Sequence, residues 1–145
     1  MTDLSISPPQ NREPLRVSVV IPVYNGDRYI TQAIDSVLEQ TLKAVEIIVV
    51  DDGSTDQTRQ RVTNYEKSPA AESLPPIHYL YQENQGVAVA RNRGIAAAQG
   101  EFIAFLDADD YFSSPTKLAD QLECFTQNPR LGLVQCGWQL VDEAG

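Results

Sequence analysis

Short apolar runs recur along the chain and are separated by longer, more polar stretches. Runs of about five residues rich in Val, Ile and Phe, without strict alternation, are typical of strands buried on both faces of a parallel sheet. The first run stops at Pro22, which cannot donate to a strand ladder. The pattern predicts strands over 17–21, 46–50, 77–81, 101–106 and 131–136.

Helical spacing fills the stretches between these runs. Ile30, Ala33, Ile34, Val37 and Leu38 follow the i, i+3, i+4, i+7 and i+8 positions of one helical face. They predict a helix from about residue 27 to residue 40. The other predicted helices are one that starts at a Ser54–Gln57 capping box, one over 87–98 closed by Gly100, and one from the Ser114–Pro115 cap to Asn128.

Strand and helix therefore alternate, which predicts an α/β fold with an open, mostly parallel sheet and helices on both faces. A length of 145 residues allows one domain. Residues 1–15 carry Ser, Pro and charges without an apolar signal-peptide core, so we expect a disordered lead there. Residues 16–145 are predicted to form the folded domain.

The chain is acidic, with 20 Asp and Glu residues, 11 Lys and Arg residues and a net charge of −9. This balance opposes the counterion release that drives nucleic-acid binding, so no nucleic-acid partner is expected. No apolar run approaches the roughly 18 to 20 residues needed to span a bilayer. Cys124 and Cys136 lack zinc spacing and are expected to be reduced and buried. We expect a cytoplasmic protein without a membrane segment.

The fourth apolar run ends abruptly on Asp107, Asp109 and Asp110. Carboxylates at the edge of a core are costly unless a charged or hydrogen-bonding partner waits for them. In extended backbone Asp107 and Asp109 point to the same side, about 6.5 to 7 Å apart at Cα. Mg²⁺ or Mn²⁺ usually takes one or two protein carboxylates and completes its shell with phosphate and water. The alternative is a polar turn that only caps the next helix.

Polar residues also follow two other predicted strands. Tyr24 and Asn25 come after the first, and Asp52 comes after the second. Asp52 lies in an Asp-Asp-Gly-Ser sequence that ordinary turn and cap chemistry also explains. Because the carboxyl ends of parallel strands meet along one edge of a sheet, these residues and the acidic triplet are predicted to form one site.

Five motifs occur in order with the expected elements between them. These motifs are Val17–Gly26, Val50–Asp56, Asn84–Gly86, Ala90–Gly94 and Phe105–Asp110. Together they resemble family 2 glycosyltransferases of the GT-A fold, over about residues 16–140. The resemblance implies a site for a nucleoside-diphosphate sugar, with a UDP-sugar favoured.

The resemblance also implies roles for individual residues. Pro22 and Tyr24 would line the base pocket, and Asp52 would accept a hydrogen bond from the base. Asp107 would approach the ribose or the metal shell, and Asp109 would ligate Mg²⁺ or Mn²⁺. The other residues that we expect at the donor site are Asn25, Gly86, Arg91 and Ala108.

Transfer to an acceptor hydroxyl also needs a general base. In this family that carboxylate belongs to the acceptor half, whereas only one predicted helix and one strand follow the metal motif. We therefore expect an N-terminal donor-binding half and assign no general base; Asp142 and Glu143 are better explained as an exposed tail. The parent enzyme would transfer the sugar to a saccharide or lipid, with inversion.

Two other functions stay open on the sequence. One is a nucleotide-binding module without transfer activity. The other is a magnesium-dependent phosphohydrolase with an Asp-x-Asp nucleophile pair, although that pair would follow the first strand of its sheet and not the fourth.

Overall fold

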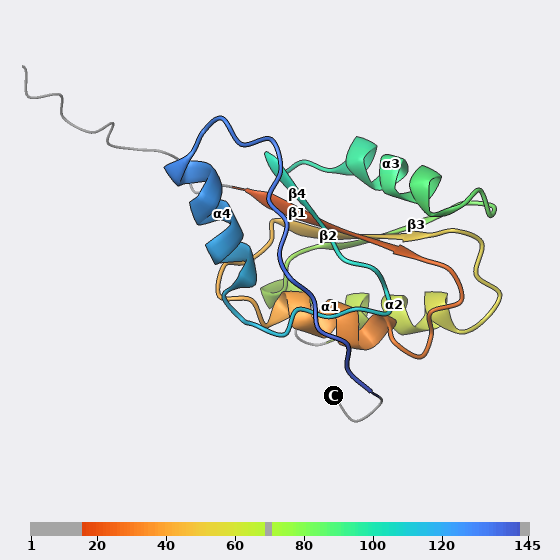
Figure 1. Ribbon diagram of the computed structural model, residues 1–145. Helices are drawn as coiled ribbons and strands as arrows, with labels where there is room; N and C mark the ends of the chain where they lie inside the picture. Colours follow the sequence, from red (N-terminus) through yellow and green to blue (C-terminus); the bar gives the residue numbers. More distant parts are fainter. Residues whose placement is uncertain (1–15, 69–70, 143–145) are drawn as a thin grey trace, which may run out of the picture.

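The computed structural model describes residues 16–68 and 71–142. The predicted disordered lead over 1–15 lies outside the described residues, as does Glu143. The described chain forms a four-stranded sheet in the order β3-β2-β1-β4, and every pairing is parallel (Figure 1). The strands are β1 (Val17–Val23), β2 (Glu46–Asp51), β3 (Ile77–Tyr81) and β4 (Phe102–Phe105).

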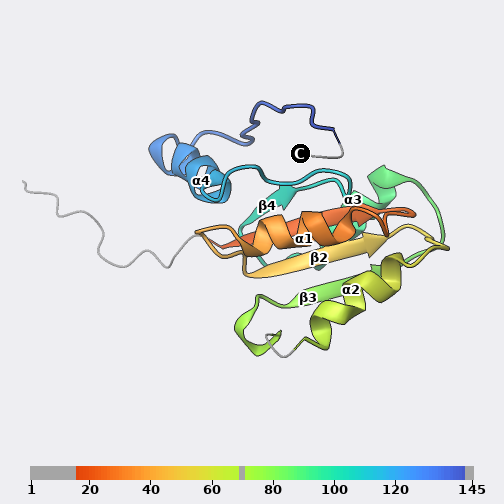
Figure 2. The same ribbon diagram turned by 90° about the horizontal axis from the view of Figure 1, so that it is seen from below.

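Helices cover both faces of the sheet, as the sequence predicts. The helices are α1 (Ile30–Leu38), α2 (Thr58–Glu66), α3 (Val87–Ala97) and α4 (Lys117–Gln127), with a 3₁₀ turn η1 at Ala71–Ser73. Among the helices of the described chain, α3 covers one face of the sheet, and α1 and α2 cover the other (Figures 1 and 2). No helix in the described ranges is long and apolar enough to cross a membrane.

The core has two layers because alternate strand residues point to opposite faces. Val19 and Ile21 of β1 pack toward α1, α2 and α4, whereas Val20 packs with Ala90 of α3. All seven residues of β1 are buried, so this strand forms the centre of the fold. Its carboxyl end is therefore held in a fixed position between the neighbouring strands.

Gly94 allows α3 to approach β1 closely. A Cβ atom on Gly94 would lie 2.3 Å from Cγ1 of Val20. We expect Gly94→Ala to lower the free energy of unfolding by about 1 to 3 kcal/mol, because overpacking outweighs the gain in helix propensity. Urea unfolding measures this loss. Adding Val20→Ala should recover part of the lost stability, because it removes the methyl groups that the added Cβ atom would meet. If the effects of the two substitutions on stability simply add, the predicted clash is absent.

Strand β1 runs past Pro22 to Val23, which corrects the predicted end of the first strand. Val20 O accepts from Leu106 N, and the last residue of β4, Phe105, pairs with Val20. Pro22 faces the same neighbour two residues later, where β4 has already ended. No ladder bond is needed at Pro22, so the missing N–H costs nothing there.

The predicted capping box at Ser54 is wrong, because α2 begins at Thr58. Ser54 Oγ instead accepts from Asn25 N at 2.8 Å, and Asp56 Oδ1 accepts from Thr58 N at 2.9 Å. Gly100 does not cap α3 in a left-handed conformation. It lies so close to Ser18 that a Cβ would be 2.6 Å from the Ser18 nitrogen, so packing requires this glycine.

Residues 131–136 do not form the predicted fifth strand; residues 128–142 contain neither helix nor strand. A strand requires a backbone partner, and none of the described segments pairs with this one. Leu133, Trp138 and Leu140 are 74%, 82% and 83% exposed, and Cys136 is exposed rather than buried. The apolar pattern of the segment alone was not sufficient to predict a strand.

Candidate functional site

The order of the strands places a switch in chain direction at the centre of the sheet. From β1 the chain moves outward to β2 and β3, and then returns to add β4 on the other side of β1. The loops that follow β1 and β4 therefore separate and leave a crevice at the carboxyl ends of these strands, which is where ligands bind in open α/β sheets.

A cavity of about 310 Å³ occupies this crevice. It lies between the β1 loop and the β4 loop and is lined by Pro22, Val23, Tyr24, Asn25, Gly26, Tyr29, Val87, Asp107, Ala108 and Asp109. Six of the predicted site residues are thus brought together, namely Pro22, Tyr24, Asn25, Asp107, Ala108 and Asp109.

On the β1 side, Pro22 is buried and Tyr24 is 56% exposed. Asn25 adopts a left-handed conformation with φ 51°, which asparagine tolerates better than most residues. Its Oδ1 accepts from Thr55 N at 2.9 Å, and its own N–H donates to Ser54 Oγ at 2.8 Å. Asn25 therefore ties the β1 loop to the loop that follows β2.

On the β4 side, Asp107 is half-buried, Ala108 is buried and Asp109 is exposed. Asp107 Oδ1 accepts from Arg91 Nη2 at 2.6 Å. None of the residues described in the structure contacts the Asp109 carboxylate through a hydrogen bond or ion pair. Burial and the charges of Asp109 and Asp107 raise the pKa of Asp110, and Lys117 partly offsets this.

The donor atoms of this cavity fit a divalent cation only together with an anionic ligand. No group of three or more His, Cys, Asp or Glu side chains that could hold a metal ion occurs in the part of the chain that the structure describes. Asp109 and the second oxygen of Asp107 supply one or two carboxylate positions. One or two protein carboxylates are enough for Mg²⁺ or Mn²⁺ when phosphate oxygens and water complete the coordination shell.

Asp52 does not line the cavity and instead organises the loop before α3. Its Oδ1 accepts from Gln82 Nε2 at 2.7 Å and from Gln85 N at 2.9 Å, and its Oδ2 accepts from Gly86 N at 2.8 Å. Burial raises the pKa of Asp52, but these three hydrogen bonds outweigh burial and hold it below the ordinary value. Gly86, with φ 92°, meets the carboxylate through its backbone.

Arg91 reaches the site from α3. Besides the ion pair with Asp107, its guanidinium lies 6.0 Å from the centre of the Phe105 ring. The Nε atom is buried and has no hydrogen-bond partner among the described residues. The sequence predicts Arg91 at the donor site but does not predict its contact with Asp107, which only the structure reveals.

Comparison with known sequences identifies the family. The profile described as Glycosyl transferase family 2 matches residues 18–139. The chain belongs to glycosyltransferase family 2. The family resemblance stated on the five motifs is thereby confirmed.

Two curated glycosyltransferase relatives illustrate the similarity. The Nostoc sp. protein named "Uncharacterized glycosyltransferase alr2836" is 44% identical over 120 residues, which cover 83% of this chain and 36% of the relative. The Bacillus subtilis protein named "Putative teichuronic acid biosynthesis glycosyltransferase TuaG" is 46% identical over 114 residues, which cover 78% of this chain and 42% of the relative. The chain thus spans about two fifths or less of the length of these relatives.

Solved structures show the same fold. S. aureus TarS 1–349 in complex with UDP superposes with a TM-score of 0.68 at 33% identity, and the match covers 79% of this chain and 33% of the TarS 1–349 chain. The mannosyltransferase PcManGT from Pyrobaculum calidifontis, in complex with GDP-Man and Mn²⁺, superposes with a TM-score of 0.69 at 28% identity. This match covers 76% of this chain and 32% of the PcManGT chain. The predicted GT-A fold is therefore confirmed.

Three residues at or next to the candidate site were not predicted from the sequence. Tyr29 and Val87 line the cavity from the entries to α1 and α3, and Gln82 holds Asp52. Tyr29 lies in the first turn of the helix predicted from about residue 27, Val87 is the first residue of the helix predicted over 87–98, and Gln82 directly follows β3. Their position near the carboxyl ends of strands is the sequence signal that could have indicated them.

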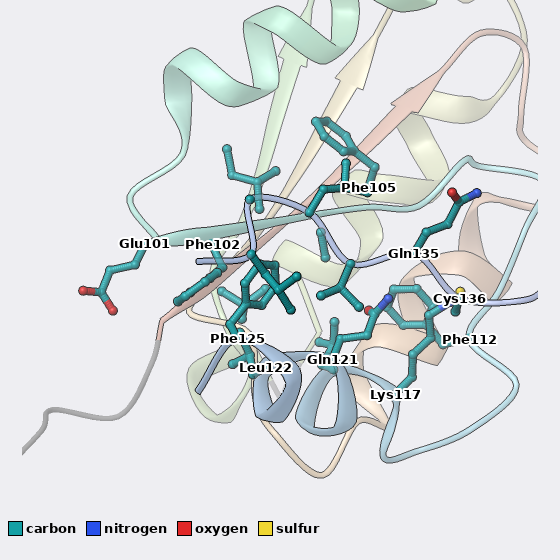
Figure 3. Close-up of a pocket in the computed structure, with 18 residues that line it drawn as sticks. Glu101, Phe102, Phe105, Phe112, Lys117, Gln121, Leu122, Phe125, Gln135 and Cys136 are labelled. Carbon is teal, nitrogen blue, oxygen red and sulfur yellow. Dashed lines mark hydrogen bonds between the residues drawn. The ribbon is translucent and has the colours of Figure 1, made fainter. Parts of the chain in front are cut away.

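A second cavity, of about 570 Å³, lies between β4, α4 and the segment 131–136 (Figure 3). Its walls are mainly apolar, with Phe102, Phe112 and Phe125 among them, and Glu101 points away from it. It contains none of the residues that the sequence assigns to the donor site. Although this cavity is larger, six of the residues predicted for the donor site line the smaller one, which is therefore the candidate site.

Proposed function

We propose that residues 16–145 form the donor-binding part of a family 2 glycosyltransferase. This part binds a nucleoside-diphosphate sugar together with Mg²⁺ or Mn²⁺, and the parent enzyme transfers the sugar to an acceptor hydroxyl with inversion. The observation that carries the proposal is the 310 Å³ cavity at the switch point of the sheet, lined by both the β1 loop and the acidic β4 loop.

The nucleoside binds against the β1 side of this cavity. Pro22 and the exposed ring of Tyr24 offer apolar faces for a base. Asp52 does not line the cavity and already accepts three hydrogen bonds, so a hydrogen bond from the base requires the remaining acceptor position of its carboxylate and a base that extends past the cavity lining. Asn25 and Gly86 hold the two loops around the nucleoside in place.

The diphosphate binds against the β4 side. Asp109 is the carboxylate that ligates the cation, and Asp107 faces the ribose or the metal shell, with Ala108 forming the wall between them. The cation supplies Lewis-acid stabilisation of the leaving diphosphate. Without it, the acidic loop and the net charge of −9 would repel that group.

A UDP-sugar is the favoured donor, because TarS, whose structures contain UDP and UDP-GlcNAc, is among the similar folds. The GDP-Man complex of PcManGT makes a guanine nucleotide the second choice. The acceptor is a saccharide or lipid of unassigned identity. The predicted cytoplasmic location and the absence of a nucleic-acid partner remain predictions.

Isothermal calorimetry with UDP, GDP and dTDP, each with Mn²⁺ and with EDTA, tests the proposal. We expect UDP to bind only with Mn²⁺, and at least about tenfold more tightly than the other two. Absence of metal-dependent binding to any of the three would contradict the proposed site. Metal-dependent release of phosphate from p-nitrophenyl phosphate would favour the phosphohydrolase alternative instead.

A further inference from the structure

The contact between Arg91 and Asp107 links α3 to the acidic loop. Arg91 Nη2 donates to Asp107 Oδ1 at 2.6 Å, and the two side chains are 38% and 44% exposed. The backbone around Arg91 has a fixed position because its neighbours Ala90 and Gly94 are packed against the sheet. The guanidinium is therefore delivered to Asp107 by a rigid element.

This ion pair reduces the number of carboxylate oxygens that a free metal ion can bind in the cavity. One oxygen of Asp107 is already engaged, and the guanidinium charge repels a second cation nearby. Among the described residues of the acidic loop, Asp109 is left as the cavity carboxylate without a charged partner. One carboxylate in water is a weak ligand set for Mg²⁺ or Mn²⁺.

We propose that Arg91 makes metal binding conditional on the nucleotide: it neutralises Asp107 and keeps a free divalent cation out until a diphosphate supplies further oxygens. This inference rests on the proposed function of the same cavity. It assigns Arg91 the role of a positioning residue that acts through Asp107, rather than that of a direct metal or donor ligand.

The geometry of the pair also allows the contact between Arg91 and Asp107 to break. Only one nitrogen of Arg91 contacts Asp107, and the buried Nε has no partner among the described residues. A guanidinium in a two-pronged pair with a carboxylate would be held more firmly. A cation that arrives with a diphosphate can therefore displace this single contact and draw Asp107 into the metal shell.

Electron paramagnetic resonance of free Mn²⁺ measures metal binding without any activity assay. In the absence of nucleotide, Arg91→Met should bind Mn²⁺ about tenfold more tightly than the unmodified chain. Arg91→Lys keeps the charge and should stay within about threefold of the unmodified chain. With saturating UDP the gain of Arg91→Met should fall below about threefold, because the diphosphate then supplies the missing oxygens.

Arg93→Met is the matched control, because Arg93 lies on the same helix but donates to Tyr81 O at 2.7 Å. It should leave Mn²⁺ affinity unchanged. Adding Asp107→Asn to Arg91→Met should remove the gain, since the released carboxylate is then absent. Arg91→Gln provides a second neutral variant if Arg91→Met does not fold.

The inference is overturned if the neutral Arg91 variants bind free Mn²⁺ no more tightly than the unmodified chain, or if Arg93→Met produces the same gain. Failure of the proposed function looks different. In that case the unmodified chain shows no Mn²⁺-dependent binding of UDP, whatever residue occupies position 91.

Discussion

Asp109→Asn is expected to abolish the metal dependence of nucleotide binding. The Asp109 carboxylate lines the cavity, is exposed and has no hydrogen-bond or ion-pair partner in the described part of the chain. An uncharged amide is a poor ligand for a hard dication. UDP affinity measured by calorimetry with Mn²⁺ should fall by about a hundredfold, whereas in EDTA neither the variant nor the unmodified chain should bind UDP.

Asp110→Asn is the control that distinguishes metal ligation by Asp109 from the overall negative charge of the loop, because it removes one negative charge from the neighbouring residue. Asp110 is exposed and does not line the cavity. We expect its effect on Mn²⁺-dependent UDP affinity to stay within about threefold. If both variants lose affinity equally, the acidic loop acts only through its overall charge, and the assignment of Asp109 as a ligand is wrong.

The architecture of the sheet could be predicted because it depends on a pattern that extends over the whole chain. Strands buried on both faces read as apolar runs, and parallel neighbours require helical crossovers between them. The bounds of β3 at Ile77–Tyr81 agree with the prediction. The order β3-β2-β1-β4 was not predicted, because it depends on which strands pair and not on the composition of any one strand.

The helix starts were predicted less well, because several polar side chains compete for each free backbone N–H. Ser54 has the sequence signature of a cap, yet its hydroxyl accepts from Asn25 N, 29 positions away. Helix α4 begins at Lys117, with Thr116 rather than Ser114 at the cap position. Local motifs predict caps only where no distant donor claims the same oxygen.

The candidate site could be predicted as far as its residues follow directly from strand ends. Pro22, Tyr24, Asn25 and Asp107–Asp109 line one cavity for this reason. The partner of each carboxylate could not be predicted, because it depends on distances between segments. Asp107 meets Arg91, and Asp52 meets the backbone of the loop before α3.

Asp107 and Asp52 both follow strands of the same sheet but differ in their hydrogen-bond partners. Asp107 pairs with a charged side chain at the surface of the cavity. Asp52 is 4% exposed and accepts only uncharged donors from Gln82, Gln85 and Gly86. Loss of Asp52 is therefore expected to affect folding of the loop as well as binding.

Asp52→Asn is expected to lower the free energy of unfolding by about 3 kcal/mol at pH 7. The amide keeps the shape of the side chain but places an N–H₂ group against at least one of the N–H donors of Gln85 or Gly86. Urea unfolding measures the loss, and amide hydrogen exchange at Gly86 should become faster. Glu83→Gln, which removes an exposed charge from the same loop, should change stability by less than about 0.5 kcal/mol.

The pH dependence of this difference distinguishes a lost carboxylate from a general defect in the loop. The pKa of Asp52 is lowered in the folded chain because the three hydrogen bonds outweigh burial, so the unfolded chain binds its proton first as the pH falls. The stability that Asp52 contributes is fully present above its ordinary pKa of 3.8 and is lost as the pH falls through the lower, folded-state value. The gap between the unmodified chain and Asp52→Asn should therefore be widest near pH 7 and narrow below about pH 4. A gap that stays constant from pH 7 to pH 3 would show that the carboxylate charge does not stabilise the loop.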